Sequence, residues 1–545
     1  MAFPSAGDQA ELPDAPIQLD SPAALTAELP PGDGAEVTEI AESADGETIP
    51  PQRGADPEPP PRRMRLRLGR PTWRSAGPWI LAFGLLLVYC VDTIARYERF
   101  APMSWDLGLF TEAVKQYAHF HAPIVDARSP GFNLLGEHFS PIIALLAPFW
   151  WIFPTPVMIL VAQGALFALG SVPITRLGVE RIGTGAGYAL GAAYGLSFGL
   201  ANAVDADFHE VAFAVPLISL ALCAFMRDQL GRCAFWAFLL VFVKEDFGMA
   251  MVMPIGIAII LKGRPLLGAA LSAAGTASSL LALYWILPAL NPNHTYEFWS
   301  KEGCADPTAA VHQSPLCLIG QTAQSGGSKL ELLFLLLAVT AFVALRSPLV
   351  ILALPNLFSR LASNDSSFWG TAWHYNAPLM PLLFIAAADG IIRARNAGEL
   401  DAAAGHVRRW ARGVSDAMQR HGAVAMLAVA VALVPQFAYG QFFDPDTFSF
   451  DARTAALGHA MSLVPDGVSV ETTLNMLAPL GARDDAYWVG NTNPATDYVV
   501  FDSVVSGFSP PVTNVLQFEE QRHPGVTYKI IYEDQWGIYV LEKAS

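Results

Sequence analysis

Long apolar segments recur along this chain and alternate with short loops that hold most of its charged residues. The first, GPWILAFGLLLVYCVDTIA at residues 77–95, is long enough to cross the hydrocarbon core of a bilayer as a helix. Further apolar segments lie near residues 139–176, 185–203, 211–226, 233–261, 266–289, 329–345, 347–361, 376–392 and 421–440. The pattern predicts an α-helical polytopic membrane protein with about ten or eleven transmembrane helices.

The distribution of basic residues predicts how these segments are oriented. Six arginines and no acidic residue lie in residues 61–74, directly before the first segment, and the most basic loop, residues 393–420, precedes the last one. Because cytoplasmic loops are enriched in Lys and Arg, we expect residues 1–76 and 393–420 on the cytoplasmic side. The same alternation places outside the membrane residues 96–138, 291–328 and 444–545.

This alternation depends on two long apolar segments. Residues 139–176 begin with FSPIIALLAPFWWIFPTP, whose prolines and aromatic band suit an interfacial helix followed by one crossing. Residues 233–261 are interrupted by VKEDFG. Lys244, Glu245 and Asp246 would each cost ~2.5–3.5 kcal/mol at the centre of a lipid-exposed helix. We therefore expect two short helices with a break at this motif.

Composition agrees with a membrane protein and shows that the net charge belongs to the chain ends. The 545 residues are 53% hydrophobic and only 15% charged, with a mean hydropathy of +0.36, which excludes an ordinary soluble domain. The formal charge is −16, but residues 1–60 contain thirteen acidic residues against the single Arg53. Rich in Pro, Ala and Gly, residues 1–75 are predicted to be a disordered cytoplasmic tail that ends in the basic cluster. Nothing in this charge pattern indicates a nucleic-acid partner.

The chain changes character after Asp444. The turn-rich segments GVSVETT, TDYVVFD, YKIIYED and WGIYVLE are typical of short strands, and helical patterns lie between them. We expect a small extracytoplasmic α/β domain at residues 444–545, following the membrane domain at residues 76–443. Such a domain is either a packing module or a docking surface for an acceptor or polymer.

Ionisable residues gather at the outer ends of the predicted helices, whereas the inner loops carry mostly arginine. Such residues at membrane depth are usually retained for pathways or chemistry. The candidate site residues are Asp106, then Glu137 and His138 in GEHFSP, Asp207, His209 and Glu210 in DADFHE, Lys244 and Glu245 in VKEDFG, and finally Arg360 and His374. We expect one outward-facing cavity to bring together Asp106, Glu137, His138, Asp207, Glu210, Lys244 and His374.

The segment SWDLGLFTEAVKQYAHFH, residues 104–121, has the pattern of an amphipathic helix. One face would carry Phe110, Ala113, Val114 and Tyr117, and the other Glu112, Lys115, Gln116 and His119. This pattern predicts a helix that lies on the outer membrane surface with Asp106 at its N-terminus. Asp106 is then either a helix N-cap or a general base that faces a lipid-borne substrate.

The other motifs also have structural interpretations. DADFHE fits helix capping with an interfacial His, and VKEDFG fits a Lys–Glu pair that braces a helix break. HEVAF begins like a zinc-protease motif but has Phe213 in place of the second His, and GTGAGYALGAAYG at 183–195 predicts close helix packing rather than a phosphate loop. A disulfide between Cys304 and Cys317, which share one outer loop, is compatible with an oxidising compartment.

Four motifs in order, SWDLGLFTEAV, GEHFSPIIALLAPFW, VKEDFGM and LPNLFSRLAS…WHYNAPLMPLLF, resemble the DUF2079 family of predicted bacterial membrane proteins across roughly residues 80–540. That family is similar in layout to the GT-C membrane glycosyltransferases, which use polyprenyl-phosphate sugar donors. The resemblance implies a GT-C-like fold in the bacterial plasma (inner) membrane. It also implies, as partners, membrane lipid, a polyprenyl-phosphate sugar donor, and an envelope glycan, lipid or protein acceptor.

The same resemblance assigns roles to residues. Asp106 matches the acidic residue that deprotonates the acceptor hydroxyl, and Glu137 is the second catalytic candidate. Lys244, Arg360 and His374 would neutralise the phosphate, while Glu137, Asp207 and Glu210 would orient the acceptor or hold a divalent cation. His138, His209 and Glu245 complete the substrate-binding candidates. The only D-x-D near an outer loop, Asp205 with Asp207, does not align with the metal-dependent pattern, so the metal ligands stay unassigned.

Two other classes of function fit the sequence. In a transporter or lipid flippase, residues 244–246 would line a translocation path, although paired halves are then expected and no internal repeat is visible. The third class is an envelope scaffold without catalysis.

Overall fold

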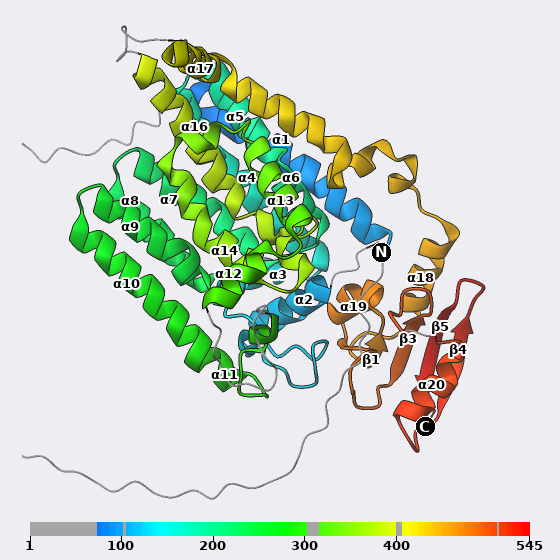
Figure 1. The fold of residues 1–545 in the computed structure, drawn as a ribbon. Coiled ribbons are helices and arrows are strands. Elements are labelled where there is room, and N and C mark those ends of the chain that lie inside the picture. The colour runs from blue at the N-terminus through cyan, green and yellow to red at the C-terminus, as the bar shows by residue number, and fades with distance from the viewer. Residues whose placement is uncertain (1–72, 102–104, 302–314, 399–405, 509–511, 545) are drawn as a thin grey trace, which may run out of the picture. The chain divides into compact units, whose positions relative to one another are not determined.

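The computed structural model describes residues 73–101, 105–301, 315–398, 406–508 and 512–544 (Figure 1). The chain divides into two units, residues 1–70 and 71–545, and all of the described elements belong to the second. The predicted tail lies outside the described residues except for its last three positions, where helix α1 begins at Trp73.

Helices dominate the described residues up to residue 443. They are α1 (Trp73–Glu98), α2 (Trp105–Ala118), α3 (Ala147–Trp150), α4 (Pro156–Arg181), α5 (Thr184–Gly195), α6 (Phe198–Asp205), α7 (Ala214–Met226), α8 (Leu230–Phe238), α9 (Met253–Leu261), α10 (Pro265–Leu281), α11 (Leu287–Leu290), α12 (Pro315–Ala323), α13 (Gly326–Ala338), α14 (Leu354–Ala362), α15 (Ser366–Trp369), α16 (Leu379–Gly398) and α17 (His406–Leu433).

Within the described residues, five helical segments are long and apolar enough to cross a membrane: Ala76–Glu98, Pro156–Arg181, Pro265–Leu290, His374–Arg395 and Gly413–Gln436. Five shorter apolar helices of 10–17 residues accompany them. The helical membrane-protein class is thus confirmed, whereas the number of crossings stays a prediction. The segment that includes α16 is the central one, because 89% of its apolar window is buried, compared with 22% for that of α17.

The predicted break at VKEDFG is confirmed. α8 continues as a 3₁₀ turn, Leu239–Phe242, and after residues 243–247 a π-helical turn, Gly248–Val252, leads into α9. The charged residues of the motif lie in the break, and α9 then packs along α10 (Figure 1). The chain therefore avoids placing three ionisable side chains in the middle of one apolar helix.

The glycine-rich segment at 183–195 forms α5, which packs closely on α4 as predicted. A Cβ built on Gly187 would lie 2.2 Å from Val179 N and 2.6 Å from Gly178 C, both of which are backbone atoms of α4. Only hydrogen fits at this crossing, so the small residues serve helix packing.

The C-terminal segment forms a five-stranded sheet in the order β2-β1-β3-β5-β4, which confirms the mixed α/β character of this region (Figure 1). β1 (Ser469–Thr472) pairs in parallel with β2 (Asp485–Trp488) and β3 (Tyr498–Asp502). β5 (Ile538–Lys543) runs antiparallel to β3 and β4 (Tyr528–Glu533). The accompanying helices are α18 (Ala452–Ser462), α19 (Leu474–Gly481) and α20 (Val515–Arg522).

The α4–α5 crossing generates a stability prediction. Gly187→Ala should lower the free energy of unfolding by about 1–3 kcal/mol, because the added methyl group overlaps backbone that cannot rotate away. The matched control is Gly185→Ala in the same helix, where a Cβ would meet nothing within 4 Å. We expect that control to be neutral or stabilising by up to ~1 kcal/mol. Apparent melting temperatures of the detergent-purified variants measure both effects, and equal shifts would contradict the packing role.

Candidate functional site

Asp106 lies in the first turn of α2, one residue inside the helix rather than before it. A carboxylate at this position is stabilised by the positive, N-terminal end of the helix dipole. Protein covers more of this helix than its amphipathic pattern predicts. Residues 107–114 are all buried, and α2 packs between α3 and α19.

The predicted polar face of α2 is wrong at Glu112, which is only 3% exposed. Its carboxylate accepts a hydrogen bond from Ala127 N at 3.1 Å. Next to it, Lys115 Nζ donates to Asp484 O at 2.7 Å. The loop after α2 and part of the C-terminal region therefore cover the face of α2 that the helical pattern assigned to solvent. These contacts fix the helix that carries Asp106.

His209 lies in the loop that follows α6, and a buried amide on α4 holds this loop. Gln163 Nε2 donates to Ala203 O at 3.0 Å and to Asp207 O at 2.6 Å, while Gln163 Oε1 accepts from His209 N at 3.0 Å. Asp207 has a φ of +61°, in the left-handed region that non-glycine residues rarely adopt. The glutamine thus stabilises a tight turn that presents the His209 ring, against which Phe110 packs edge-on.

His374 lies on the loop between α15 and α16, and Arg360 of α14 fixes that loop from behind. The Arg360 guanidinium donates to Phe368 O at 2.7 Å, Tyr375 O at 3.0 Å and Asn376 Oδ1 at 2.8 Å. The Arg360 side chain is buried, and these contacts give it a positioning role. Its predicted contact with phosphate stays a prediction.

The imidazole of His374 stacks on that of His209, with ring centroids 3.4 Å apart and an interplanar angle of 19°. His374 is 3% exposed, and neither of its ring nitrogens has a hydrogen-bond partner among the described residues. An unsatisfied buried polar group costs ~1–3 kcal/mol. The fold therefore maintains a polar side chain whose nitrogens are available to another group.

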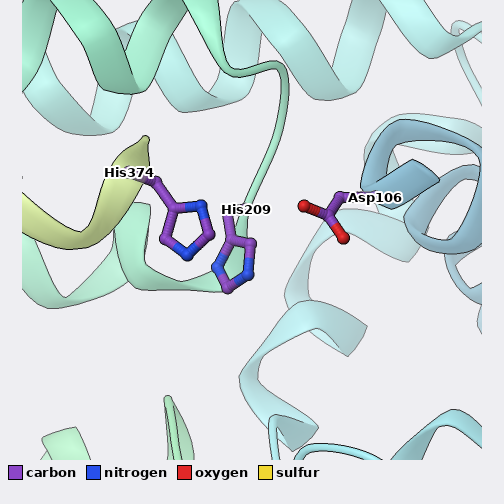
Figure 2. Close-up of side chains that lie close together, drawn as sticks. All are labelled: Asp106, His209 and His374. Atoms are coloured by element: carbon purple, nitrogen blue, oxygen red, sulfur yellow. The ribbon is translucent and has the colours of Figure 1, made fainter. Parts of the chain in front are cut away.

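Asp106, His209 and His374 converge although three distant parts of the chain supply them (Figure 2). Each offers one carboxylate oxygen or ring nitrogen, and these three atoms all lie within 4.8 Å of one another. In Figure 2 the Asp106 carboxylate faces the His209 ring, with the His374 ring beyond it. We call this group the Asp–His–His cluster. Two of its members, Asp106 and His374, are among the residues that the sequence predicts in one cavity, and the complete cavity stays a prediction.

A buried ionic network adjoins the cluster. Glu210 Oε1 lies 3.1 Å from Lys244 Nζ, and Glu210 Oε2 lies 2.6 Å from His209 Nδ1, an ionic contact without the alignment of a hydrogen bond. Glu245 Oε1 lies 2.8 Å from His138 Nδ1 and accepts from Tyr296 OH at 2.9 Å. The ring of His138 is 6.5 Å from that of His209. The sequence-predicted residues Glu210, Lys244, Glu245 and His138 therefore belong to one neighbourhood.

Burial and neighbouring charges set the protonation of this network. Burial alone would raise the pKa of Glu245, but His138 and Lys244 outweigh it and lower that pKa to about 2. For Lys244, burial alone would lower the pKa, yet Glu210 and Glu245 raise it above the ordinary value. Lys244 therefore keeps a full positive charge at neutral pH.

Glu137 belongs to a different group of contacts. Its carboxylate pairs with Arg128 at 3.2 Å, and Arg128 also reaches Glu297 at 2.8 Å. A catalytic role for Glu137 stays a prediction, as does a substrate contact for Asp207. Cys304, one of the two cysteines of the predicted Cys304–Cys317 disulfide, lies outside the described residues. Cys90, Cys223 and Cys233 are free thiols.

Gln163 and Tyr296 shape this site, and Arg128 shapes the separate group that contains Glu137, but none of the three was predicted from the sequence. Gln163 had a usable signal, because it is an isolated amide within a long apolar helix. Tyr296 had none, since its partner Glu245 lies far away in the sequence. Arg128 pairs with the nearby Glu137 and with the distant Glu297, and no local pattern indicated either contact.

The sequence from residue 96 to residue 523 matches the family described as "Predicted membrane protein (DUF2079)". No curated protein matches the chain. Two crystal structures of ArnT from Cupriavidus metallidurans are similar to it. The one bound to undecaprenyl phosphate has 14% sequence identity and a TM-score of 0.46. The apo form has 13% identity and a TM-score of 0.45. Each match covers 86% of this chain and 98% of the ArnT chain.

The buried Glu112 that anchors α2 generates a pH prediction. Burial raises its pKa from about 4.5 to about 8, so between these values the folded state binds more protons than the unfolded state. The contribution of Glu112 to stability therefore falls as the pH rises through this window. Glu112→Gln keeps an acceptor for Ala127 N and removes the titration. Relative to wild type, its apparent melting temperature should be higher at pH 8.5 than at pH 5.

The exposed Glu520 on α20 supplies the control for this comparison, since Glu520→Gln removes a solvated carboxylate. Its melting temperature relative to wild type should change little between the two pH values. If the melting temperature of Glu112→Gln relative to wild type also changes little between the two pH values, Glu112 does not titrate in this window.

Proposed function

This chain belongs to the DUF2079 family of predicted membrane proteins, and we propose that it transfers a sugar from a polyprenyl-phosphate donor to an acceptor of the cell envelope. The observation that carries the proposal is the convergence of Asp106 with two buried histidines beside a charged lysine. The GT-C layout suggested by the sequence motifs supplies the reaction class, and the side-chain geometry is compatible with it.

Asp106 is the best-placed general base among the carboxylates of this neighbourhood. Glu210 and Glu245 are fully buried and paired with cationic groups, whereas Asp106 is only partly buried. Asp106 would take the proton of the acceptor hydroxyl as that oxygen bonds to the anomeric carbon of the sugar. The bond between the anomeric carbon and the phosphate oxygen breaks, and its electron pair leaves with the lipid phosphate.

Lys244 provides the positive charge that this leaving group needs. Its ammonium stays protonated, and its side chain retains 12% exposure while paired with Glu210. A fixed cation at a buried site stabilises developing negative charge more strongly than water does. We assign phosphate recognition to Lys244 together with His374, and a positioning role to Arg360.

An apolar cavity of about 570 Å³ offers a place for the lipid chain. Its lining includes Leu145, Phe149, Phe153, Met158 and Phe213. Phe213 ends the 3₁₀ turn Glu210–Phe213, so one turn of backbone links this cavity to the ionic network. A polyprenyl chain seated there would bring its phosphate toward Lys244.

Catalysis predicts a specific effect of Asp106→Asn. This variant keeps the size of the side chain but removes the proton acceptor, so turnover should fall by ~10²–10⁴-fold while folding survives. The assay follows release of polyprenyl phosphate from a panel of polyprenyl-phosphate sugars by the reconstituted full-length protein. Asp451→Asn is the control, because Asp451 caps the exposed start of α18 and asparagine caps equally well.

Equal turnover by wild type and Asp106→Asn would refute the assigned base. A flippase would move the donor across the bilayer without releasing phosphate, and a scaffold would do neither. Both alternatives are therefore distinguishable in the same vesicles.

The proposed location is the bacterial plasma membrane, with the N-terminus cytoplasmic and residues 444–545 extracytoplasmic. In a background without native cysteines, an impermeant maleimide added to intact cells should label Ser449→Cys and not Ala403→Cys. Permeabilised cells, in which both variants should react, provide the control. The reverse pattern in intact cells would place the site on the wrong side for an envelope acceptor.

A further inference from the structure

We propose that Asp106, His209 and His374 bind one divalent transition-metal ion of the Zn²⁺ class. The inference concerns ion binding in the absence of substrate, so it holds or fails independently of the proposed reaction. It begins from the three ligand atoms that lie within 4.8 Å of one another. Two atoms bound to a tetrahedral zinc ion are about 3.3–3.5 Å apart. The side chains must therefore rotate, and the stacked rings of His209 and His374 must tilt apart, for the three atoms to bind one ion.

The donor set selects the class of ion. Two imidazoles and one carboxylate suit zinc and related transition metals, whereas Mg²⁺ and Ca²⁺ prefer oxygen ligands throughout. Three protein ligands leave at least one coordination position for water or substrate, as in catalytic zinc sites. Asp106 needs only one carboxylate oxygen to bind the ion.

His374 supplies the second, independent observation. It is 97% buried, and both of its ring nitrogens lack a hydrogen-bond partner among the described residues, although the ring points into the Asp–His–His cluster (Figure 2). The His374 ring stacks on the His209 ring at a centroid separation of 3.4 Å, so the two imidazoles lie together in the cluster.

The surroundings of His209 fit the outer shell of a metal site. Glu210 Oε2 lies 2.6 Å from His209 Nδ1, which leaves Nε2 as the coordinating atom. A rotation of the ring would let Nδ1–H donate to this carboxylate, and a carboxylate bonded in this way orients a histidine ligand and increases its basicity. Lys244 in turn fixes Glu210 at 3.1 Å, so this carboxylate is held in place.

A second group of ionisable side chains has similar spacing but different surroundings. Glu471, Glu519 and His523 also place three ligand atoms within 4.8 Å of one another. There, however, Arg522 lies 2.6 Å from Glu471 and 3.3 Å from Glu519, so a guanidinium already compensates the carboxylates. We assign that cluster to the folding of the C-terminal region, and it provides a matched control.

The test measures metal on the full-length protein, purified in detergent with a tag that contains no histidine and stripped with a chelator. After equilibration with Zn²⁺, elemental analysis should find one tightly bound ion per wild-type chain. Co²⁺ in its place should give the visible bands of nitrogen and oxygen ligation. His374→Asn and Asp106→Asn should each weaken binding by more than ~100-fold, which exceeds the usual effect of losing an outer-shell partner.

His523→Asn should retain full metal content and the same Co²⁺ spectrum. The melting temperatures of metal-free wild type and variants establish that each variant is folded, and added Zn²⁺ should raise the melting temperature of wild type and His523→Asn alone. If wild-type protein contains no bound metal after equilibration with Zn²⁺, the proposal is wrong. Undiminished binding by His374→Asn and Asp106→Asn, or loss of binding in His523→Asn, would also overturn it.

Discussion

The buried carboxylate of Glu210 is the interaction on which the arrangement of the site depends. It is fully buried and contacts both Lys244 and His209, which come from different loops. A buried charge that loses its partner destabilises a protein by ~3–5 kcal/mol, so the fold cannot separate these loops without a large penalty. This constraint holds the break between α8 and α9 against the turn before α7, and it fixes the ring of His209.

Other polar contacts extend this constraint outward. Glu245 joins the same break to His138 and Tyr296, Gln163 clamps the turn that carries His209, and Arg360 anchors the loop of His374. Because each contact lies in a low-dielectric interior, each is stronger than it would be in water and more costly to leave incomplete. Side chains from distant segments are thereby held in place without a long rigid element between them. Asp106, on a helix packed against the C-terminal region, completes the cluster from the opposite side.

Much of this arrangement could be predicted from the sequence where local physical chemistry decides the outcome. The charges of VKEDFG predicted a helix break because an apolar helix does not tolerate them, and the glycines of α5 predicted close packing. The motifs DADFHE and VKEDFG also marked residues that do come together. Where partners lie far apart in the chain, the sequence carried no such signal. The helical pattern of α2 assigned Glu112 to solvent, since nothing in the neighbouring sequence shows that distant segments of the same chain cover that face. The pairing of Arg128 with Glu137, and with Glu297 much later in the chain, was also not predicted. The stacking of His209 on His374 likewise arises only from the tertiary fold.

The most direct test of the account is whether residues 106 and 374 meet in the membrane-embedded protein. In a cysteine-free background, Asp106→Cys with His374→Cys should be joined by a short bifunctional thiol reagent in native membranes. Asp126→Cys with His374→Cys, whose first cysteine lies on the loop beyond α2, serves as the comparison. We expect a cross-link in the first pair. After cleavage at a protease site engineered between the two positions, this cross-link should keep the two fragments joined. Absence of that cross-link, or equal cross-linking in the comparison pair, would contradict the existence of a single site.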